Sequence, residues 1–219
     1  MALNLGQQIS TPAQPNLGTP APAYDQGFFG TSFGGLNAYF TKLTAIFAAL
    51  FGQRGGKWIN NPYGAFQDTT DQTATANTAT VMTFNTTDFA NGVSVVSNSK
   101  LTVAQAGIYN LQFSVQFENT DTQEHDATIW LRKNGTDITG SAGFVSVPNS
   151  HGGIDGHAIV GWNYFVTLDA NDFVEIWWST PSNLVSIQAY AAGTSPTRPT
   201  TASVVASLSF VSNLSVETA

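Results

Sequence analysis

The sequence predicts an all-β domain that follows an extended N-terminal arm and one amphipathic helix. Three observations support this prediction. Residues 109–117 alternate between apolar and polar side chains without a miss, as in a half-buried strand. Turn-forming residues separate many further short apolar runs between residues 62 and 211. Apolar residues recur at helical spacing convincingly only in residues 33–51.

The strongest strand signal begins after Gly107, which supplies a turn. One face of the predicted strand carries Tyr109, Leu111, Phe113, Val115 and Phe117, and the other carries Asn110, Gln112, Ser114 and Gln116. Because side chains of a strand point alternately to its two sides, this segment has one face for a core and one polar face.

Further strands are predicted on both sides of this segment. The candidates are Tyr63–Phe66, Val81–Asn85, Gly92–Val96, Leu101–Val103, Ile108–Phe117, Ala127–Lys133, Gly143–Val147, Ala158–Leu168, Phe173–Ser179, Leu184–Tyr190 and Ala202–Val211. Turn signals lie between them, with Asn91-Gly92 and Asn134-Gly135 the clearest. Many short strands without intervening helices indicate a sandwich or barrel. The Thr-rich residues 69–80 are either a long loop or an irregular edge strand.

The helix predicted over Phe33–Phe51 has one broad apolar stripe. Its members are Leu36, Tyr39, Phe40, Leu43, Ile46, Phe47 and Leu50. Gly34 and Gly35 are expected to precede the helix and Gly52 to end it. The stripe repeats for about two heptads, fewer than the three to four that argue for a free-standing coiled coil.

Three partners for this stripe remain open. It can form a three-helix stalk at an oligomer axis, which we favour, pack against the β-domain, or bind a foreign partner. A membrane span is disfavoured, because Asn37, Thr41, Lys42 and Thr44 interrupt a stretch that is also too short.

The first residues are expected to be an extended arm. Four of the nine prolines, Pro12, Pro15, Pro20 and Pro22, lie in this segment among Gly, Gln, Ala and Thr. Such a sequence buries too little apolar area to fold alone. We expect it to lie on a partner surface, the alternative being a segment foreign to the native chain. The predicted organisation is an arm over 1–32, a helix and Gly-rich linker over 33–61, and a β-domain over 62–219.

The charge of the chain is low and unevenly distributed. Charged residues make up 10 % and the net charge is −7. Residues 1–61 carry three basic side chains and one acidic, giving +2, whereas residues 62–219 carry four basic and thirteen acidic, giving −9. Because phosphate contacts need Lys and Arg, nucleic acid is not an expected partner. Cysteine is absent, which excludes disulfides and thiolate chemistry. No signal peptide is recognised at the start.

Several segments, taken in order, resemble one superfamily. Residues 106–113 are similar to the Ala-Gly-x-Tyr-x-x-x-Phe strand of the C1q/tumour-necrosis-factor (C1q/TNF) jelly-roll superfamily, and residues 131–135 to its next strand with an Asn-Gly turn. Residues 168–176 resemble its Leu-x-x-Gly-Asp-x-Val-x-Leu element, with Asn171 where Gly is usual. Residues 207–210 stand where its last core strand lies.

The resemblance covers residues 62–211 and implies a C1q/TNF-like jelly-roll sandwich. Similar modules occur on bacteriophage capsids, head fibres and tail fibres, commonly as trimers. The chain lacks the collagen repeat and signal peptide of animal C1q proteins, which favours the viral branch. The resemblance therefore implies a homotrimer located on a virion.

Surface aromatic residues are the candidate interaction site. Trp177 and Trp178 are adjacent on one predicted strand, so their side chains must face opposite sides and one of them leaves the core. An exposed Trp commonly marks an interface. Trp177, Trp178 and Tyr190 are the candidate subunit or ligand surface, with subunit contact favoured over ligand binding.

No catalytic constellation is recognised. His151, Asp155 and His157 could present metal ligands, but their Gly-rich spacing favours an exposed turn or, less often, a metal or receptor contact. The carboxylate pairs Asp169/Asp172 and Glu124/Asp126 lie at predicted turns, where Asp caps the local backbone. Neither a nucleophile elbow nor a phosphate-binding loop is found. We therefore expect no enzyme, no cofactor and no metal site.

The leading hypothesis is a structural virion protein of a bacteriophage. In this hypothesis residues 1–61 bind other virion proteins, without membrane insertion, and a trimeric jelly roll projects as a capsid decoration or head/tail fibre. The alternative is a receptor-binding fibre tip that recognises host surface glycan through its aromatic residues. A third hypothesis, a glycan-active enzyme, needs a carboxylate pair in a cleft that the sequence does not identify.

Overall fold

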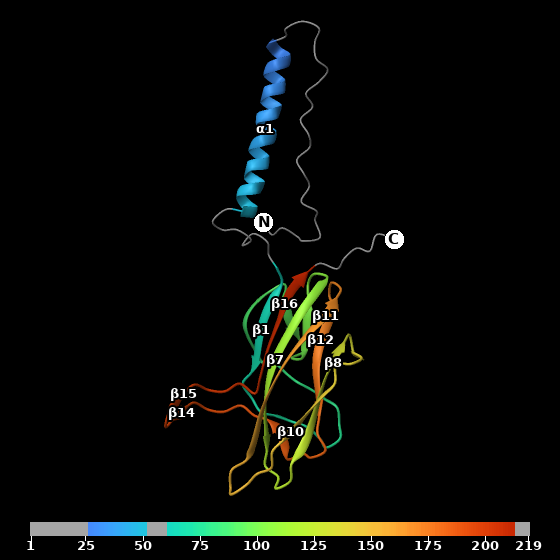
Figure 1. Ribbon diagram of the computed structural model, residues 1–219, viewed down its shortest axis with the longest axis vertical. Helices are drawn as coiled ribbons and strands as arrows, with labels where there is room; N and C mark the ends of the chain where they lie inside the picture. The colour runs from blue at the N-terminus through green and yellow to red at the C-terminus, as the bar shows by residue number, and fades with distance from the viewer. Residues whose placement is uncertain (1–25, 52–60, 213–219) are drawn as a thin grey trace. The chain divides into compact units, whose positions relative to one another are not determined.

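A computed structural model of the chain describes residues 26–51 and 61–212 (Figure 1). The chain divides into two units, residues 1–60 and residues 61–219. The predicted arm lies outside the described residues as far as residue 25. Its predicted boundary at residue 32 is wrong, because residues 26–32 already belong to a helix.

Helix α1 runs from Gln26 to Phe51, so it begins seven residues earlier than predicted and ends where predicted. Gly34 and Gly35 lie inside it. Glycine costs about 1 kcal/mol relative to alanine in a helix but keeps its backbone N–H, so a helix can continue through it. Of the predicted stripe, Leu36, Tyr39, Leu43 and Ile46 are half-buried and Phe40 and Phe47 are exposed, while the side chain of Leu50 lies outside the described residues.

The second unit is a sandwich of two β-sheets. Sheet A contains β1 (Tyr63–Asp68), β2 (Gln72–Thr73), β4 (Thr86–Asn91), β7 (Gly107–Asn119), β11 (Gly156–Leu168), β13 (Val185–Ile187) and β16 (Val204–Ser212). Hydrogen-bonded neighbours follow the order β2-β13-β7-β16-β1-β4. Strands β13 and β16 pair with successive parts of one side of β7, and β11 pairs with its other side. The all-β prediction is thus confirmed.

Sheet B contains β3 (Thr80–Val81), β5 (Val93–Val96), β6 (Lys100–Val103), β8 (His125–Lys133), β9 (Thr136–Asp137), β10 (Gly143–Val147) and β12 (Phe173–Ser179). Its order is β10-β8-β12-β6-β5, with β3 on β12 and β9 on β8. A separate small ribbon joins β14 (Gly193–Thr194) to β15 (Thr197–Arg198). All these strands pair antiparallel, for example β7 with β11 and β8 with β12.

The core lies between the two sheets, and the alternation of β7 determines which side chains reach it. Tyr109, Leu111, Phe113, Val115 and Phe117 are all buried, as predicted. The Tyr109 hydroxyl donates to the Gln105 carbonyl at 2.7 Å, which satisfies its polar atom inside an apolar layer. Buried residues of sheet B face them, among them Leu101, Leu131, Ile176 and Trp178.

Residues suited to turns explain why several strand ends were predicted accurately. Asn134 and Gly135 have positive φ values of 50° and 82°, as a tight hairpin between β8 and β9 needs. Asn171 also has a positive φ, of 71°. Asparagine tolerates this left-handed region better than other non-glycine residues, which explains how it can stand where the resembling motif has Gly.

Two predicted strands are much shorter than expected. The segment predicted over Val81–Asn85 is extended only at β3, because the backbone N–H groups of Met82 and Phe84 donate to the carbonyls of Ile176 and Asn98 outside a regular ladder. The segment predicted over Leu184–Tyr190 contains only β13. Strand β4, which carries both Asp88 and exposed Phe89, was not predicted because it lacks an alternating pattern.

Replacing Leu208 by alanine tests which side chains of β16 face the core and which face solvent. Leu208 of β16 is fully buried opposite Leu111, and its neighbour Ser209 is exposed. We expect Leu208→Ala to lower the free energy of unfolding by about 2–5 kcal/mol, since it leaves a cavity. The control Ser209→Ala is expected to change it by less than about 0.5 kcal/mol. Chemical denaturation at one chain concentration measures both, and equal effects would contradict the assignment of faces.

Candidate functional site

Most outward side chains of the central strands of sheet A are uncharged, and they form a broad surface, here called the sheet A face. It is made by Asn110, Gln112, Ser114 and Gln116 of β7, Val205, Ser207 and Ser209 of β16, and Asn163 and Thr167 of β11. None of these side chains ionises. Short amide, hydroxyl and apolar groups of this kind can pack against another protein without desolvating a charge.

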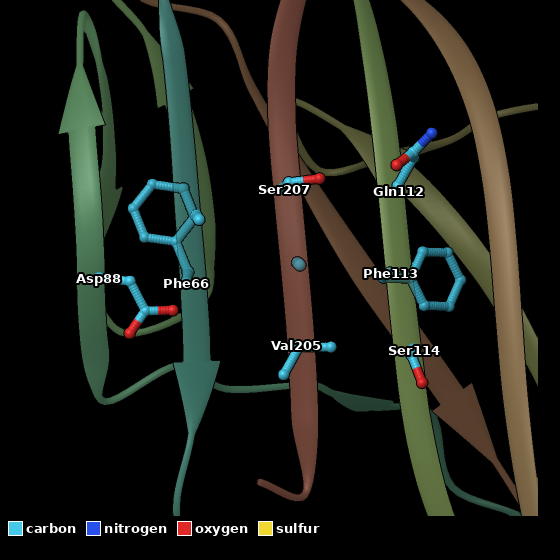
Figure 2. Close-up of a pocket in the computed structure, with 9 residues that line it drawn as sticks. Phe66, Asp88, Gln112, Phe113, Ser114, Val205 and Ser207 are labelled. Atoms are coloured by element: carbon cyan, nitrogen blue, oxygen red, sulfur yellow. The ribbon is translucent and has the colours of Figure 1, made fainter.

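A shallow hollow of about 370 Å³ lies within the sheet A face. Figure 2 shows Val205 and Ser207 of β16 between Asp88 on one side and Gln112 and Ser114 on the other. Among the residues that the structure describes, Asp88 is the only ionisable one lining the hollow, and its carboxylate accepts from Gln67 Nε2 at 2.6 Å. One carboxylate that is hydrogen-bonded to Gln67 does not form an acid–base pair. The hollow therefore fits a packing role better than a catalytic one.

Three large apolar side chains are exposed beside this face, at the edge formed by β10 and β11. Phe144 is 77 % exposed, Ile159 is 73 % exposed and Phe165 is 58 % exposed. A groove of about 260 Å³ runs between the two strands and is lined by Gly143, Phe144 and Trp162 among others. We call Phe144, Ile159, Phe165 and this groove the edge patch. Exposed apolar side chains along one edge of a sandwich are a candidate interaction site.

Gly143 allows Trp162 to pack closely beneath the edge patch. A Cβ atom at this position would lie 2.9 Å from the Trp162 ring, so the indole packs directly on the glycine backbone. Trp162 in turn contacts Phe113 of β7, with ring centroids 6.2 Å apart. The edge patch is therefore supported from the core.

Trp177 and Trp178 lie on opposite sides of β12. Trp178 is fully buried and packs on Phe117, with ring centroids 5.6 Å apart. As a core residue it is not available as a surface, so the inclusion of Trp178 in the candidate surface was wrong. Trp177 is half-buried on the outer side of sheet B, where it lies opposite Trp130 of β8.

Polar contacts hold the Trp130–Trp177 pair in place. The two ring centroids are 6.5 Å apart, and the Arg132 guanidinium lies 3.8 Å from the centroid of Trp177. Asp137 accepts from Trp130 Nε1 at 2.8 Å and also from Arg132, whose hydrogen bond lowers the pKa of Asp137. Each member of the cluster thus has a partner, which is typical of a stabilising surface ladder.

Tyr190 lies elsewhere, at one end of the sheet A face. Its hydroxyl donates to Glu118 Oε2 at 2.7 Å and lies 3.2 Å from His157 Nδ1. Burial is the main cause that raises the pKa of Tyr190, and the hydrogen bond to Glu118 raises it further, so the phenol stays protonated. The candidates Trp177 and Tyr190 therefore belong to different surfaces.

The candidate metal-ligating residues are also separated. His151 and Ile154 bond through their backbones, His157 contacts Tyr190, and His125 Nε2 lies 2.8 Å from Asp121 Oδ2. Within residues 26–51 and 61–212, no three His, Asp or Glu side chains come together as a metal-binding group.

Of the two carboxylate pairs, Asp169/Asp172 is part of a turn. Asp172 Oδ2 accepts from the Asp169 backbone N–H at 2.8 Å and from Lys133 Nζ at 2.9 Å, and Asp172 Oδ1 accepts from Asn134 Nδ2 at 2.7 Å. In the other pair, Asp126 accepts from Ser146 Oγ at 2.6 Å. The Asp169/Asp172 contacts agree with the predicted role of aspartate in turns, whereas the prediction was wrong for Asp126, which lies within β8 opposite Ser146 of β10.

Comparison with known proteins found no matching family and no matching curated relative. Among the helices that the structure describes, none is long and apolar enough to cross a membrane.

Sequence reasoning missed the edge patch. Ile159 and Phe165 occupy outward positions of a strand that was correctly predicted, but their significance depends on β11 lying at a sheet edge. A run with apolar residues on both faces was the available signal, since one face of such a strand needs a partner beyond the core.

The turn around Asp172 generates a pH-dependence prediction. Burial raises the pKa of Asp172, but hydrogen bonds from Lys133, Asn134 and the Asp169 backbone outweigh it and hold the pKa at about 2. Because the folded pKa lies below its ordinary value, the ionised turn stabilises the protein above about pH 4 and loses this contribution as the pH falls towards 2.

We therefore expect Asp172→Asn to be less stable than the native chain at pH 7 and to lose less stability between pH 4 and 2. Denaturant unfolding at a series of pH values from 7 to 2 measures the free energy of unfolding of each variant. Asp169→Asn is the matched control, because Asp169 contributes its backbone N–H to the turn. An Asp172→Asn variant with the native acid dependence would contradict the assignment.

Proposed function

We propose that the sandwich is a C1q/TNF-like jelly roll and that the chain is a structural virion protein of a bacteriophage. In this proposal a homotrimer forms a capsid decoration or a head/tail fibre, anchored to other virion proteins by residues 1–61. The observation that carries the proposal is the strand order of the two sheets, taken together with the uncharged sheet A face.

The strand order supports a jelly roll. If the strands β1, β6, β7, β8, β10, β11, β12 and β16 are numbered one to eight along the chain, sheet A has the order 1-8-3-6 and sheet B the order 2-7-4-5. Only the connection between β8 and β10 stays within one sheet. Successive crossings of this kind are expected of the double Greek key of a jelly roll and support the proposal.

Charge supports self-association through one particular surface. Residues 62–219 carry four basic and thirteen acidic side chains, so copies of the domain repel one another over most of their surface. The sheet A face and the edge patch are adjacent and their own side chains are uncharged, while Asp88, Glu118 and His157 border the face. A ring of three copies requires two different complementary patches on each copy, and the exposed edge patch of one domain packing on the sheet A face of the next meets this requirement.

The ionisable side chains near these surfaces support a structural role rather than catalysis. Asp88 and Glu118, which border the sheet A face, are each engaged in a local hydrogen bond. A durable trimer displayed by a separate N-terminal segment accounts for a chain that combines a sandwich, an unusually uncharged face and a striped helix.

A matched pair of isoleucine substitutions tests the proposal. Ile159 in the edge patch is 73 % exposed, and Ile154 in the preceding loop is 71 % exposed. We expect Ile159→Lys to weaken trimer formation by more than about tenfold, or about 1.4 kcal/mol, because the ammonium would be desolvated at the contact. Sedimentation of the purified chain measures assembly, and the protein content of purified particles measures incorporation.

Ile154→Lys is the control and is expected to assemble and to enter particles normally. The proposal fails if the native chain sediments as a monomer or is absent from particles. Equal behaviour of the two variants would reject the edge patch as the contact.

One observation favours the alternative of a glycan-binding tip. Trp130 and Trp177 are adjacent, half-exposed indoles on the outer side of sheet B, beside the exposed carboxylate of Asp137. Aromatic faces flanked by hydrogen-bonding groups can stack on sugar rings.

If this alternative holds, Trp130→Ala and Trp177→Ala should each weaken binding to host surface glycan by about tenfold or more on a glycan array. Phe89→Ala, which removes an exposed aromatic of sheet A, is the control. The alternative fails if the native chain binds no glycan, or if all three variants bind equally.

A further inference from the structure

The observed length of α1 reveals a longer apolar repeat than the sequence prediction considered. Because the helix begins at Gln26, the repeat extends back to Phe29. Apolar residues then recur at spacings of four and three in strict alternation: Phe29, Phe33, Leu36, Phe40, Leu43, Phe47 and Leu50. The stripe covers about three heptads instead of two, which reaches the length typical of a coiled coil.

We infer that α1 packs against the α1 helices of other copies of this chain as a parallel, in-register coiled coil. Phe33, Phe40 and Phe47 occupy the a positions of its seam, and Leu36 and Leu43 occupy the alternating d positions. This inference rests on the proposed trimer and specifies how its N-terminal segment associates.

The spacing identifies a coiled coil rather than a helix that lies on a globular surface. A straight helix has 3.6 residues per turn, so a seven-residue repeat drifts by about 20° with each heptad. Residues 29–50 nevertheless keep one seam with a mean spacing of 3.5 residues. Such a seam stays in contact along its length only if helices wind around one another with a left-handed twist.

The distribution of charge identifies the partner as a second copy. Lys42 is the only charged residue between Gln26 and Phe51, and it lies outside the seam at a c position. The flanking e and g positions, where charges normally select a different partner, hold uncharged residues such as Asn37 and Thr44. Identical helices therefore meet without charge repulsion at the seam, and the helix offers a foreign partner only the single charge of Lys42.

The width of the stripe favours more than two helices. Tyr39 and Ile46 occupy g positions beside the a and d seam. Apolar a, d and g positions together cover about three sevenths of a helix, which is typical of core-facing helices in bundles rather than of a two-stranded seam. Cyclic symmetry of the proposed trimer orients its three helices in the same direction.

Burial supplies the free energy of this association. The Phe40 side chain is 54 % exposed, and its ring contacts Tyr39 with centroids 5.8 Å apart. Leu36 and Leu43 are only half-buried. Fully burying a Phe or Leu side chain contributes about 1.5–3 kcal/mol relative to exposure. Successive layers can thus stabilise a helix that has no acidic residue in its first turn and no basic residue in its last.

The absence of cysteine from the chain allows a direct test on the full-length protein. Leu36→Cys and Leu43→Cys place a thiol in the seam, and Ala45→Cys places one at an f position on the opposite side of the helix. A disulfide needs Cα atoms about 4.4–6.8 Å apart, so equal positions on two helices can be joined only if those helices are parallel and in register at the seam.

We expect mild oxidation to join both seam variants into disulfide-linked pairs on a non-reducing gel, while Ala45→Cys stays unlinked. In a trimer, roughly two thirds of the chains become linked, because the third thiol has no partner. Sedimentation under reducing conditions shows whether each variant assembles before oxidation. Loss of assembly in a seam variant, with Ala45→Cys assembled, also supports the seam.

Other outcomes overturn the inference. A trimer whose seam variants remain unlinked would leave the proposed function standing and reject the coiled coil. Disulfide linking at Ala45→Cys but not at Leu43→Cys would show that the helices meet through the opposite face, and would reject the assigned seam. A monomeric native chain would overturn the coiled coil and the proposed trimer together.

Discussion

Strand β7 pairs with β11 along one side and with β16 and β13 along the other, and the separation of its two faces underlies the rest of the sandwich. Its inner face supplies fully buried side chains from Tyr109 to Phe117. A slip of one residue in either register would exchange every inner and outer side chain. The register therefore fixes both the core and the sheet A face, because the uncharged outer residues are positioned by the same pairing that buries the inner ones.

Both described parts of the chain have a surface with few charged side chains. The residues that define the sheet A face carry no ionisable side chain, with Asp88, Glu118 and His157 at its border, and Lys42 is the only charged residue of α1. In the proposed assembly each part has its own surface for contact with further copies. Because both surfaces belong to one chain, association of the helices raises the effective concentration of the sandwiches. Contacts between uncharged groups also depend weakly on salt, which suits a particle exposed to changing media.

Much of the sandwich could be predicted because its signals are local. Alternation predicted β7, short apolar runs between turn residues predicted β10 and β12, and residues that tolerate positive φ marked one end each of β8 and β12. Strand β4 and the irregular course of Met82–Phe84 could not be predicted, since tertiary hydrogen bonds rather than pattern determine them. The helix start was misplaced because Gly34 and Gly35 were interpreted as a boundary. Which of Trp177 and Trp178 is buried, and the presence of an edge at β11, depend on sheet order, which no local pattern contains.

Cryo-electron microscopy of the particles that carry this chain tests the central proposal most directly. The account predicts projecting knobs, each with three sandwiches around one axis, with the edge patch of one sandwich on the sheet A face of the next. Single sandwiches, or particles without this chain, would contradict it.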